Sequence, residues 1–231
     1  MKDTFASVLV PIHRAGWPFV ALALGLAAGL AWLAWPLGLI GLVLAGFVAF
    51  FFRNPARVIP IGEDLVVSPA DGAVAAVRPR RPPAELELGE NPRTCISIFL
   101  SVLDVHVNRA PVGGRVLVRA YHPGRFFNAA LDKASEQNER QSFLIERPDG
   151  ARVGVVQIAG LVARRILGFV EVGAALAPGQ RIGLIRFGSR VDVYLPDGTV
   201  PLVAPGQRAI GGETVLADAR RNRPPADWRR D

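Results

Sequence analysis

Residues 182–196 read IGLIRFGSRVDVYLP, in which two apolar, β-branched runs flank the Phe-Gly-Ser step at residues 187–189. Runs of Val, Ile and Tyr bounded by Gly, Ser and Pro are typical of β-strands separated by a turn. Gly-Ser is a common turn pair, so this stretch taken alone favours an ordinary turn over a catalytic serine. It therefore predicts two strands, and the role of the serine depends on the rest of the chain.

The same pattern repeats through residues 58–231. Short apolar or alternating runs such as GAVAAVR, TCISIFLSV, GRVLVRAYH and ARVGVVQIAG recur there, separated by Pro, Gly and Asp. The 24 glycines and 19 prolines of the chain suit the many turns that this pattern requires. Only residues 128–140, NAALDKASEQNER, are typical of a helix or an ordered loop. The sequence therefore predicts a mainly β (α+β), sandwich- or barrel-like soluble domain over residues 58–231.

Residues 15–52 contain no charged residue, and this stretch is too long for a buried core helix. A helix of about 20 residues crosses the hydrocarbon core of a bilayer. Two apolar segments therefore fit, at about residues 17–35 and 37–52, with Pro36 at the bend. We expect residues 1–57 to form a membrane anchor, a transmembrane or re-entrant helical hairpin, and both forms stay open because the second segment is short.

Basic residues lie outside both ends of the apolar stretch, with Lys2 and Arg14 before it and Arg53 and Arg57 after it. Positive residues favour the cytoplasmic side of a membrane. This distribution predicts a protein of the cell membrane whose soluble domain lies on the cytoplasmic face. The alternative is a single long, tilted helix, which would place the domain in the periplasm.

The net charge of +7 favours an acidic partner or an anionic surface. Because the basic residues are scattered and few aromatic residues lie between them, anionic lipid is a simpler partner than nucleic acid. Cys95 is the only cysteine, which excludes an internal disulfide and fits a reducing compartment. The sequence has no nucleotide-binding glycine loop and no metal-ligand spacing, so we expect no bound metal.

Three ionisable side chains stand out near the ends of predicted strands. Asp71 lies in SPADG, His106 in LDVHVNRAP and His122 in YHPGRFFN. Each taken alone is more typical of a turn residue or a structural histidine than of a catalytic group. Aspartate, histidine and serine together can activate a hydroxyl, because the histidine takes its proton and the carboxylate orients the histidine. Asp71, His106 and Ser189 are the right residue types, although the sequence alone does not bring them together.

A series of motifs follows along nearly the whole chain, in the order FFRNP, SPADG, FLSVLDVHVNRAP, YHPGRFFNAALDKASEQNER, QIAGLVARRI and RFGSRVDVYLP. Together these motifs resemble the phosphatidylserine decarboxylases, and the short prokaryotic subtype is the most similar. Their common order makes the resemblance specific, whereas a Gly-Ser pair alone would carry no information.

The resemblance implies a proenzyme that cleaves its own Gly188–Ser189 bond. The products would be a β chain of residues 1–188 and an α chain of residues 189–231, which stay associated. Ser189 would become a pyruvoyl group, a covalent cofactor. The implied activity is decarboxylation of phosphatidylserine to phosphatidylethanolamine and CO2 through a Schiff base to this group. Whether the enzyme is a homo-oligomer stays open.

By the same resemblance, Asp71 and His106 occupy motif positions that supply acid–base chemistry. Longer bacterial members carry a second histidine three residues after the first, where this chain has Arg109. Either His106 serves both self-cleavage and decarboxylation, which we favour because it alone occupies a motif position, or His122 takes one of these tasks. Cationic candidates for binding the carboxylate and phosphate of the substrate are Lys133, Arg186 and Arg190.

Two other functions fit part of the sequence. A non-enzymatic, membrane-tethered β-sandwich adaptor explains the anchor and the strands but not the ordered motifs. A family member that has lost activity explains the motifs. A denaturing gel and the intact mass separate these hypotheses, because the active proenzyme gives two fragments.

Overall fold

The computed structural model describes residues 10–124, 137–160, 165–186 and 188–220. The chain forms two compact units, Met1–Ala56 and Arg57–Asp231.

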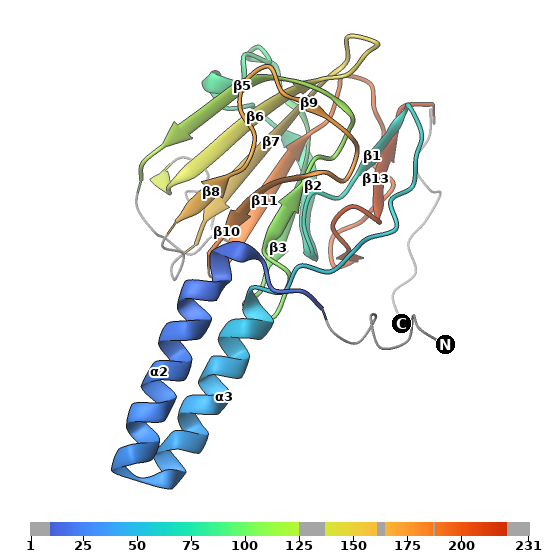
Figure 1. Cartoon of the computed structure of the whole chain (residues 1–231). Coiled ribbons are helices and arrows are strands. Elements are labelled where there is room, and N and C mark those ends of the chain that lie inside the picture. Colours follow the sequence, from blue (N-terminus) through green and yellow to red (C-terminus); the bar gives the residue numbers. More distant parts are fainter. Residues whose placement is uncertain (1–9, 125–136, 161–164, 187, 221–231) are drawn as a thin grey trace. The chain divides into compact units, whose positions relative to one another are not determined.

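In the first unit, the apolar stretch forms two helices after the short 3-10 helix η1 (Arg14–Gly16). These helices are α2 (Trp17–Leu33) and α3 (Trp35–Phe51) (Figure 1). The segment Arg14–Leu33 is long and apolar enough to cross a membrane, whereas α3 is apolar but shorter. The prediction that this stretch forms two apolar helical segments is therefore confirmed.

The bend between the helices lies at Ala34, whose backbone is extended, rather than at Pro36. Pro36 lies instead in the first turn of α3, where proline is favoured because its missing N–H would have no partner there. The helices pack through small residues. A Cβ atom on Gly41 would come within 2.6 Å of the Ala27 Cα atom, so glycine at this position lets the two backbones approach closely.

The second unit is built from strands and turns, as the sequence predicts. Its described elements are β1 (Leu65–Val67), β2 (Gly72–Arg80), the 3-10 helix η2 (Ala84–Leu86), β3 (Arg93–Leu100), β4 (Val107–Arg109), β5 (Gly114–His122), β6 (Arg140–Glu146), β7 (Arg152–Ala159), β8 (Ile166–Gly168), β9 (Ala175–Leu176), β10 (Arg181–Ile185), β11 (Ser189–Tyr194), β12 (Arg208–Ala209) and β13 (Val215–Asp218). Most of residues 128–140 lie outside the described residues, and the last of them, Arg140, begins β6.

A curled, eight-stranded sheet with the order β12-β2-β3-β11-β7-β6-β5-β9 forms the body of this unit (Figure 1). A three-stranded sheet, β4-β10-β8, and a two-stranded sheet, β1-β13, complete it. The strands on either side of Phe-Gly-Ser therefore belong to different sheets. The two strands that the sequence predicts are present, but they do not pair with each other, because the chain leaves the small sheet at the end of β10 and enters the large one at Ser189.

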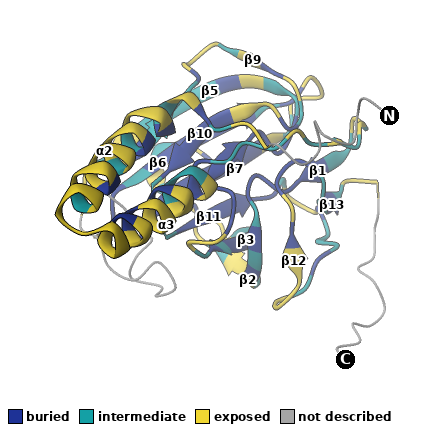
Figure 2. Ribbon diagram, turned by 60° about the horizontal axis from the view of Figure 1, so that its bottom comes forward, coloured by how far each residue is buried: buried dark blue, intermediate teal, exposed yellow. Residues whose placement is uncertain are grey.

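The main hydrophobic core covers one face of the eight-stranded sheet, and a smaller cluster covers the other. Along β11, Val191 and Val193 lie in the main core, whereas Tyr194 packs with Leu86 and Cys95 in the second cluster. This alternation follows from the two-residue period of a strand. Every residue of β11 is buried, as the dark blue ribbon in Figure 2 shows. Ser189 therefore begins a strand in the interior of the domain.

Candidate active site

Ser189 is the first residue of β11, with β3 on one side and β7 on the other. It pairs with Leu100 on β3 and with Ala159 on β7. The side chain of Ser189 is fully buried, and its hydroxyl has no hydrogen-bond partner among the described residues. Burying a hydroxyl without a partner is costly, so such a group calls for a functional explanation.

Gly188, just before this serine, has a left-handed backbone. Its φ is 63°, in the left-handed region that glycine adopts without steric cost. The Gly188 carbonyl oxygen accepts a hydrogen bond from the Gly160 N–H at 2.9 Å. The peptide bond between Gly188 and Ser189 is therefore held in a fixed orientation at the end of β7.

His106 is fully buried and lies at the same end of the domain. Its carbonyl oxygen accepts a hydrogen bond from the N–H of Ile185, the last residue of β10, at 3.2 Å. From Ile185 the chain runs directly to Ser189. The His106 Nδ1 atom lies 2.9 Å from the Asp104 carbonyl oxygen, which can only accept a hydrogen bond. Nδ1 therefore carries a proton, and in the neutral ring Nε2 is the basic nitrogen.

Asp104, which the sequence reasoning missed, holds the turn that presents this carbonyl. Its side chain is buried, and Oδ2 accepts hydrogen bonds from both the N–H and the hydroxyl of Ser101, each at 2.8 Å. Arg208 donates to Oδ1. The available signal was the Ser-x-x-Asp spacing before His106, which is typical of a side-chain-bonded turn.

Asp71 lies just before β2, and the pairing of Ala73 with Phe99 brings it to the same sheet end as Leu100. Its carboxylate accepts hydrogen bonds from Arg57 Nη2 at 2.6 Å and from the Gly211 N–H at 2.8 Å. The structure thus brings Asp71 to the Ser189 end of the sheet, where it forms an ion pair with Arg57.

Arg109 occupies the position that the sequence comparison singled out, and it is buried. Its Nη1 donates to the Gly179 carbonyl oxygen at 2.9 Å. Burial, together with the nearby charges of Arg181 and Arg57, lowers the pKa of the Arg109 guanidinium to about 10. Arg109 therefore remains a cation at neutral pH and cannot act as a general base there, as a histidine can.

His122 and Arg190 lie on the other face of the eight-stranded sheet from Ser189. The register aligns His122, Arg140, Ile158 and Arg190 across four adjacent strands, and directly opposed residues share a face. Ser189 neighbours Arg190 in β11 and therefore points the opposite way. The structure does not bring His122 together with Ser189.

These two side chains already have charged neighbours on that second face. The Arg190 Nε atom lies 2.9 Å from Asp192 Oδ1, and the His122 Nε2 atom lies 3.4 Å from Glu85 Oε1. Both side chains are therefore engaged on the face of the sheet opposite to Ser189.

Arg186, by contrast, lies close to the Gly188–Ser189 bond. Its N–H donates to the Arg165 carbonyl oxygen at 3.1 Å. Burial and the positive charge of Arg165 lower the pKa of the Arg186 guanidinium. The sequence reasoning missed Arg165, and Lys133, the third cationic candidate, lies outside the described residues. Two cations thus lie close to each other, and Arg186 is two residues before Gly188 in the chain; such a pair suits the binding of an anionic group.

A buried row of amides lies on the Ser189 face of the sheet. Gln141 donates to Gln157 at 3.0 Å, and Gln157 donates to Asn108 Oδ1 at 2.6 Å. Asn108 lies two residues after His106 on the same segment. Among the described residues there is no cluster of His, Cys, Asp or Glu that could hold a metal ion.

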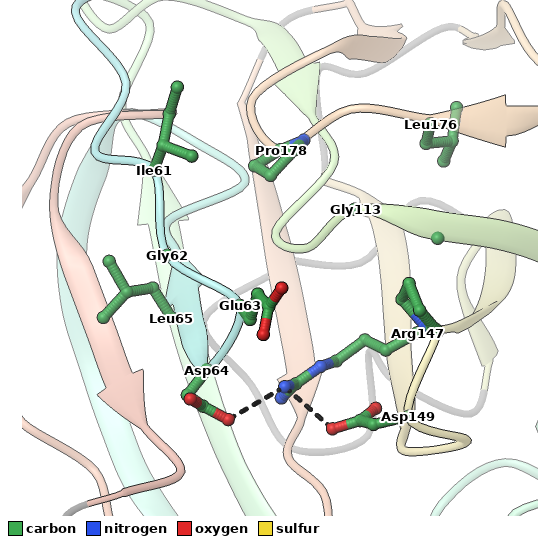
Figure 3. A pocket seen from close by; sticks show the side chains of 12 residues that line it. Ile61, Gly62, Glu63, Asp64, Leu65, Gly113, Arg147, Asp149, Leu176 and Pro178 are labelled. Atoms are coloured by element: carbon green, nitrogen blue, oxygen red, sulfur yellow. Dashed lines mark hydrogen bonds and ion pairs between the residues drawn. The ribbon is translucent and has the colours of Figure 1, made fainter.

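A cavity of about 590 Å³ lies at the other end of the sheet and takes no part in this site (Figure 3). The buried guanidinium of Arg147 forms ion pairs beside it with Asp64 at 3.2 Å and Asp149 at 2.9 Å. Arg147 directly follows β6, whose end pairs with the beginning of β7, whereas Ser189 pairs with the end of β7.

Comparison with known proteins first gives the class. Three similar proteins are each named phosphatidylserine decarboxylase proenzyme. The protein from Xanthobacter autotrophicus is 56% identical over 94% of this chain and 92% of its own length. The protein from Nitrobacter winogradskyi is 57% identical over 90% of this chain and 84% of its own length. The protein from Cereibacter sphaeroides is 54% identical over 94% of this chain and 93% of its own length.

The model of the family described as phosphatidylserine decarboxylase matches residues 44–217. This chain belongs to the phosphatidylserine decarboxylase family, as the ordered motifs predict.

Proposed function

We propose that this protein is a self-cleaving proenzyme that decarboxylates phosphatidylserine to phosphatidylethanolamine and CO2. The proposal is carried by the buried hydroxyl of Ser189, which follows a left-handed glycine and has no hydrogen-bond partner in the part of the chain that the structure describes. The names of the relatives support the substrate and the proenzyme state. Without a chemical role, burial of this hydroxyl would only destabilise the fold.

In the first step of self-cleavage, Ser189 Oγ loses its proton and attacks the carbonyl carbon of Gly188, its direct neighbour. The peptide C–N bond breaks as the nitrogen takes up a proton, and an ester replaces the amide. Ser189 Cα then loses its proton as the Gly188 carboxylate leaves. Water then hydrolyses the resulting dehydroalanine. Its nitrogen departs as ammonia, and a pyruvoyl group remains at the new chain end.

The residues around the bond suit this sequence of steps. The attack converts the Gly188 carbonyl oxygen to an oxyanion, and the Gly160 N–H, 2.9 Å from that oxygen, can stabilise it. We assign the role of base to His106, whose Nδ1 is fixed by Asp104 so that Nε2 can take up the proton. Asp71 contributes a carboxylate at the same end of the sheet.

The pyruvoyl group would supply a carbonyl that binds the substrate amine and draws electrons from Cα as CO2 leaves. The residues that line the site would then bind and protonate the substrate. Arg186 and Arg165 can bind the carboxylate or phosphate of the headgroup. Arg190 is less suited to this task, because it pairs with Asp192 on the other face. The buried His106 can return a proton to the substrate carbon.

The two products of cleavage, residues 1–188 and 189–231, would remain one folded unit. β11, which opens the small chain, pairs along its whole length with β3 and β7 of the large chain. Ion pairs from Arg208 to Asp104 and from Arg220 to Asp64 also join the two chains.

We further propose that α2 and α3 form the membrane anchor, with the soluble domain on the cytoplasmic face. Their outward side chains are apolar and exposed, and Trp32 and Trp35 near the bend are 93% and 73% exposed. Tryptophan is enriched at membrane–water interfaces. Whether the helices span the bilayer or re-enter on one side depends on their depth.

The test of the proposed function is Ser189→Ala, analysed by denaturing gel and by release of CO2 from phosphatidylserine. Ser142→Ala is the matched control, since Ser142 is also a fully buried strand serine but bonds Glu85. We expect an uncut, inactive chain for Ser189→Ala and a cut, active one for Ser142→Ala. Cleavage of the Ser189→Ala variant would refute the assigned bond. An uncut wild-type chain would favour the adaptor or an inactive family member.

A further inference from the structure

The turn after β3, at residues 101–104, is tightly held. The Asp104 N–H donates to the Ser101 carbonyl oxygen at 3.0 Å, which closes a β-turn. The Asp104 carboxylate accepts two more bonds from Ser101, and the Leu103 N–H donates to the Ser101 hydroxyl at 3.3 Å. These bonds fix Val102 and Leu103 at the tip of the turn.

The two tip residues are apolar and exposed. Val102 is 40% exposed and Leu103 is 60% exposed. The central positions of turns favour Gly, Pro, Asn, Asp and Ser, which adopt turn conformations readily and tolerate water. Holding two large apolar side chains in water opposes the hydrophobic effect. Such a turn is better explained by an apolar environment outside the domain.

This turn is continuous with the site. Leu100, directly before it, pairs with Ser189, and Asp104, its last residue, holds the ring of His106 through the carbonyl oxygen. Asp104 also pairs with Arg208, whose side chain is 68% exposed. The apolar tip is therefore bordered by a cation and lies next to the residues that would react.

We propose that the turn at residues 101–104 enters the surface of a lipid bilayer, with Val102 and Leu103 at the boundary between headgroups and acyl chains. This inference rests on the proposed function, whose substrate is a bilayer lipid that must reach Ser189. A bilayer fits the turn because it offers an apolar layer beneath an anionic one, matching an apolar tip beside Arg208. Insertion would bring headgroups to His106 and Ser189 without extracting the lipid.

The test places a polarity-sensitive fluorophore on Val102→Cys or Leu103→Cys in the full chain, reconstituted in phosphatidylcholine–phosphatidylserine vesicles. Cys95 should stay unlabelled, because it is fully buried and burial raises the pKa of its thiol. Two labelled positions guard against a variant that fails to fold.

Val172→Cys is the matched control. Val172 is also the second residue of a β-turn, closed by the Ala174 N–H and the Glu171 carbonyl oxygen at 3.1 Å, and it is 59% exposed. Its turn lies at the opposite end of the sheet, where the Gly173 N–H donates to Val116. Exposure alone would therefore give the same signal at both turns.

We expect blue-shifted emission at positions 102 and 103, quenched by lipids that carry a quencher at a depth of about 5–10 Å, and neither effect at position 172. Equal signals at the two turns would overturn the proposal. Excimer emission between pyrene labels on two copies would also overturn it and assign the turn to a protein contact. The readout needs no catalysis. If the turn inserts but the chain does not cleave itself, only the proposed function is refuted. If the chain cleaves itself but the turn does not insert, only this inference is refuted.

Discussion

The two ends of β7 differ sharply in how their polar groups are satisfied. At the end near Arg152, the buried guanidinium of Arg147 has ion-pair partners in both Asp64 and Asp149. At the other end, Ala159 pairs with Ser189, whose buried hydroxyl has no partner among the described residues. The left-handed Gly188 lies beside it.

This contrast separates stability from chemistry within one sheet. A buried charge with two partners stabilises the fold relative to the same charge alone. A buried hydroxyl without a partner among the described residues weakens the fold, and such a group persists where a reaction needs it. Substitutions at the Arg147 end should therefore change stability, and substitutions at the Ser189 end should change self-cleavage.

After Ser189→Ala, which removes the reacting hydroxyl, the largest effect is expected for His106→Ala. Removing a general base slows a proton-transfer step by about 10² to 10⁴-fold. Self-cleavage, followed by denaturing gel after synthesis in a cell-free system, should slow by that order. His122→Ala, on the other face of the sheet, should cleave at the wild-type rate. Normal processing and decarboxylation by His106→Ala would shift the role to His122.

A smaller loss is expected for Gly188→Ala. The left-handed conformation costs a residue with a Cβ atom about 1–2 kcal/mol, and a Cβ here would meet nothing within 4 Å, so the cost is conformational. Relief of that strain would turn the carbonyl away from Gly160 and slow self-cleavage.

Gly198→Ala is the control for this strain, because Gly198 has a φ of 74° and equally open surroundings. It follows β11 at the far end of that strand. It should lower stability by a similar amount and leave the half-time of cleavage unchanged. Equal slowing by both variants would mean that strain at Gly188 has no special role.

At the other end of the sheet, Arg147→Ala should lower the free energy of unfolding and leave cleavage intact. Loss of charge-assisted hydrogen bonds from a buried group costs about 1.5–3 kcal/mol, reduced here because the side chain of Asp149 is 52% exposed. Urea unfolding of the purified protein in detergent measures this change in the free energy of unfolding. Arg152→Ala, which breaks a more exposed pair with Glu146, should cost less than about 1 kcal/mol. A slower cleavage in Arg147→Ala would contradict the separation of the two ends.

Much of the fold follows from local patterns. Two apolar segments predict two helices, and alternating residues such as those of β11 predict strands. Local patterns do not predict that β10 and β11 lie in different sheets. Two strands joined by a turn have the same sequence pattern whether they pair as a hairpin or pass from one sheet to another. That placement depends on long-range pairing, such as Ser189 with Leu100.

The sequence motifs pointed to the site residues that lie within them. They did not show on which face of the sheet a side chain lies, because that depends on the register of the strands. His106 and Ser189 lie at one end of the domain, as a joint role requires. His122 and Arg190 had suitable chemistry, but the period of their strands turns them to the other face. Asp104 went unnoticed because its contribution is a backbone carbonyl and a turn, which residue type alone does not reveal.

The central claim is that Ser189 is consumed in making the active enzyme, and the intact mass of the purified protein under denaturing conditions tests it most directly. The account predicts two chains that break after Gly188, with the small chain about 17 Da lighter than its encoded residues because ammonia has been lost. Its first residue should resist Edman degradation. A single uncut chain, or a small chain that begins with an intact serine, would contradict the account.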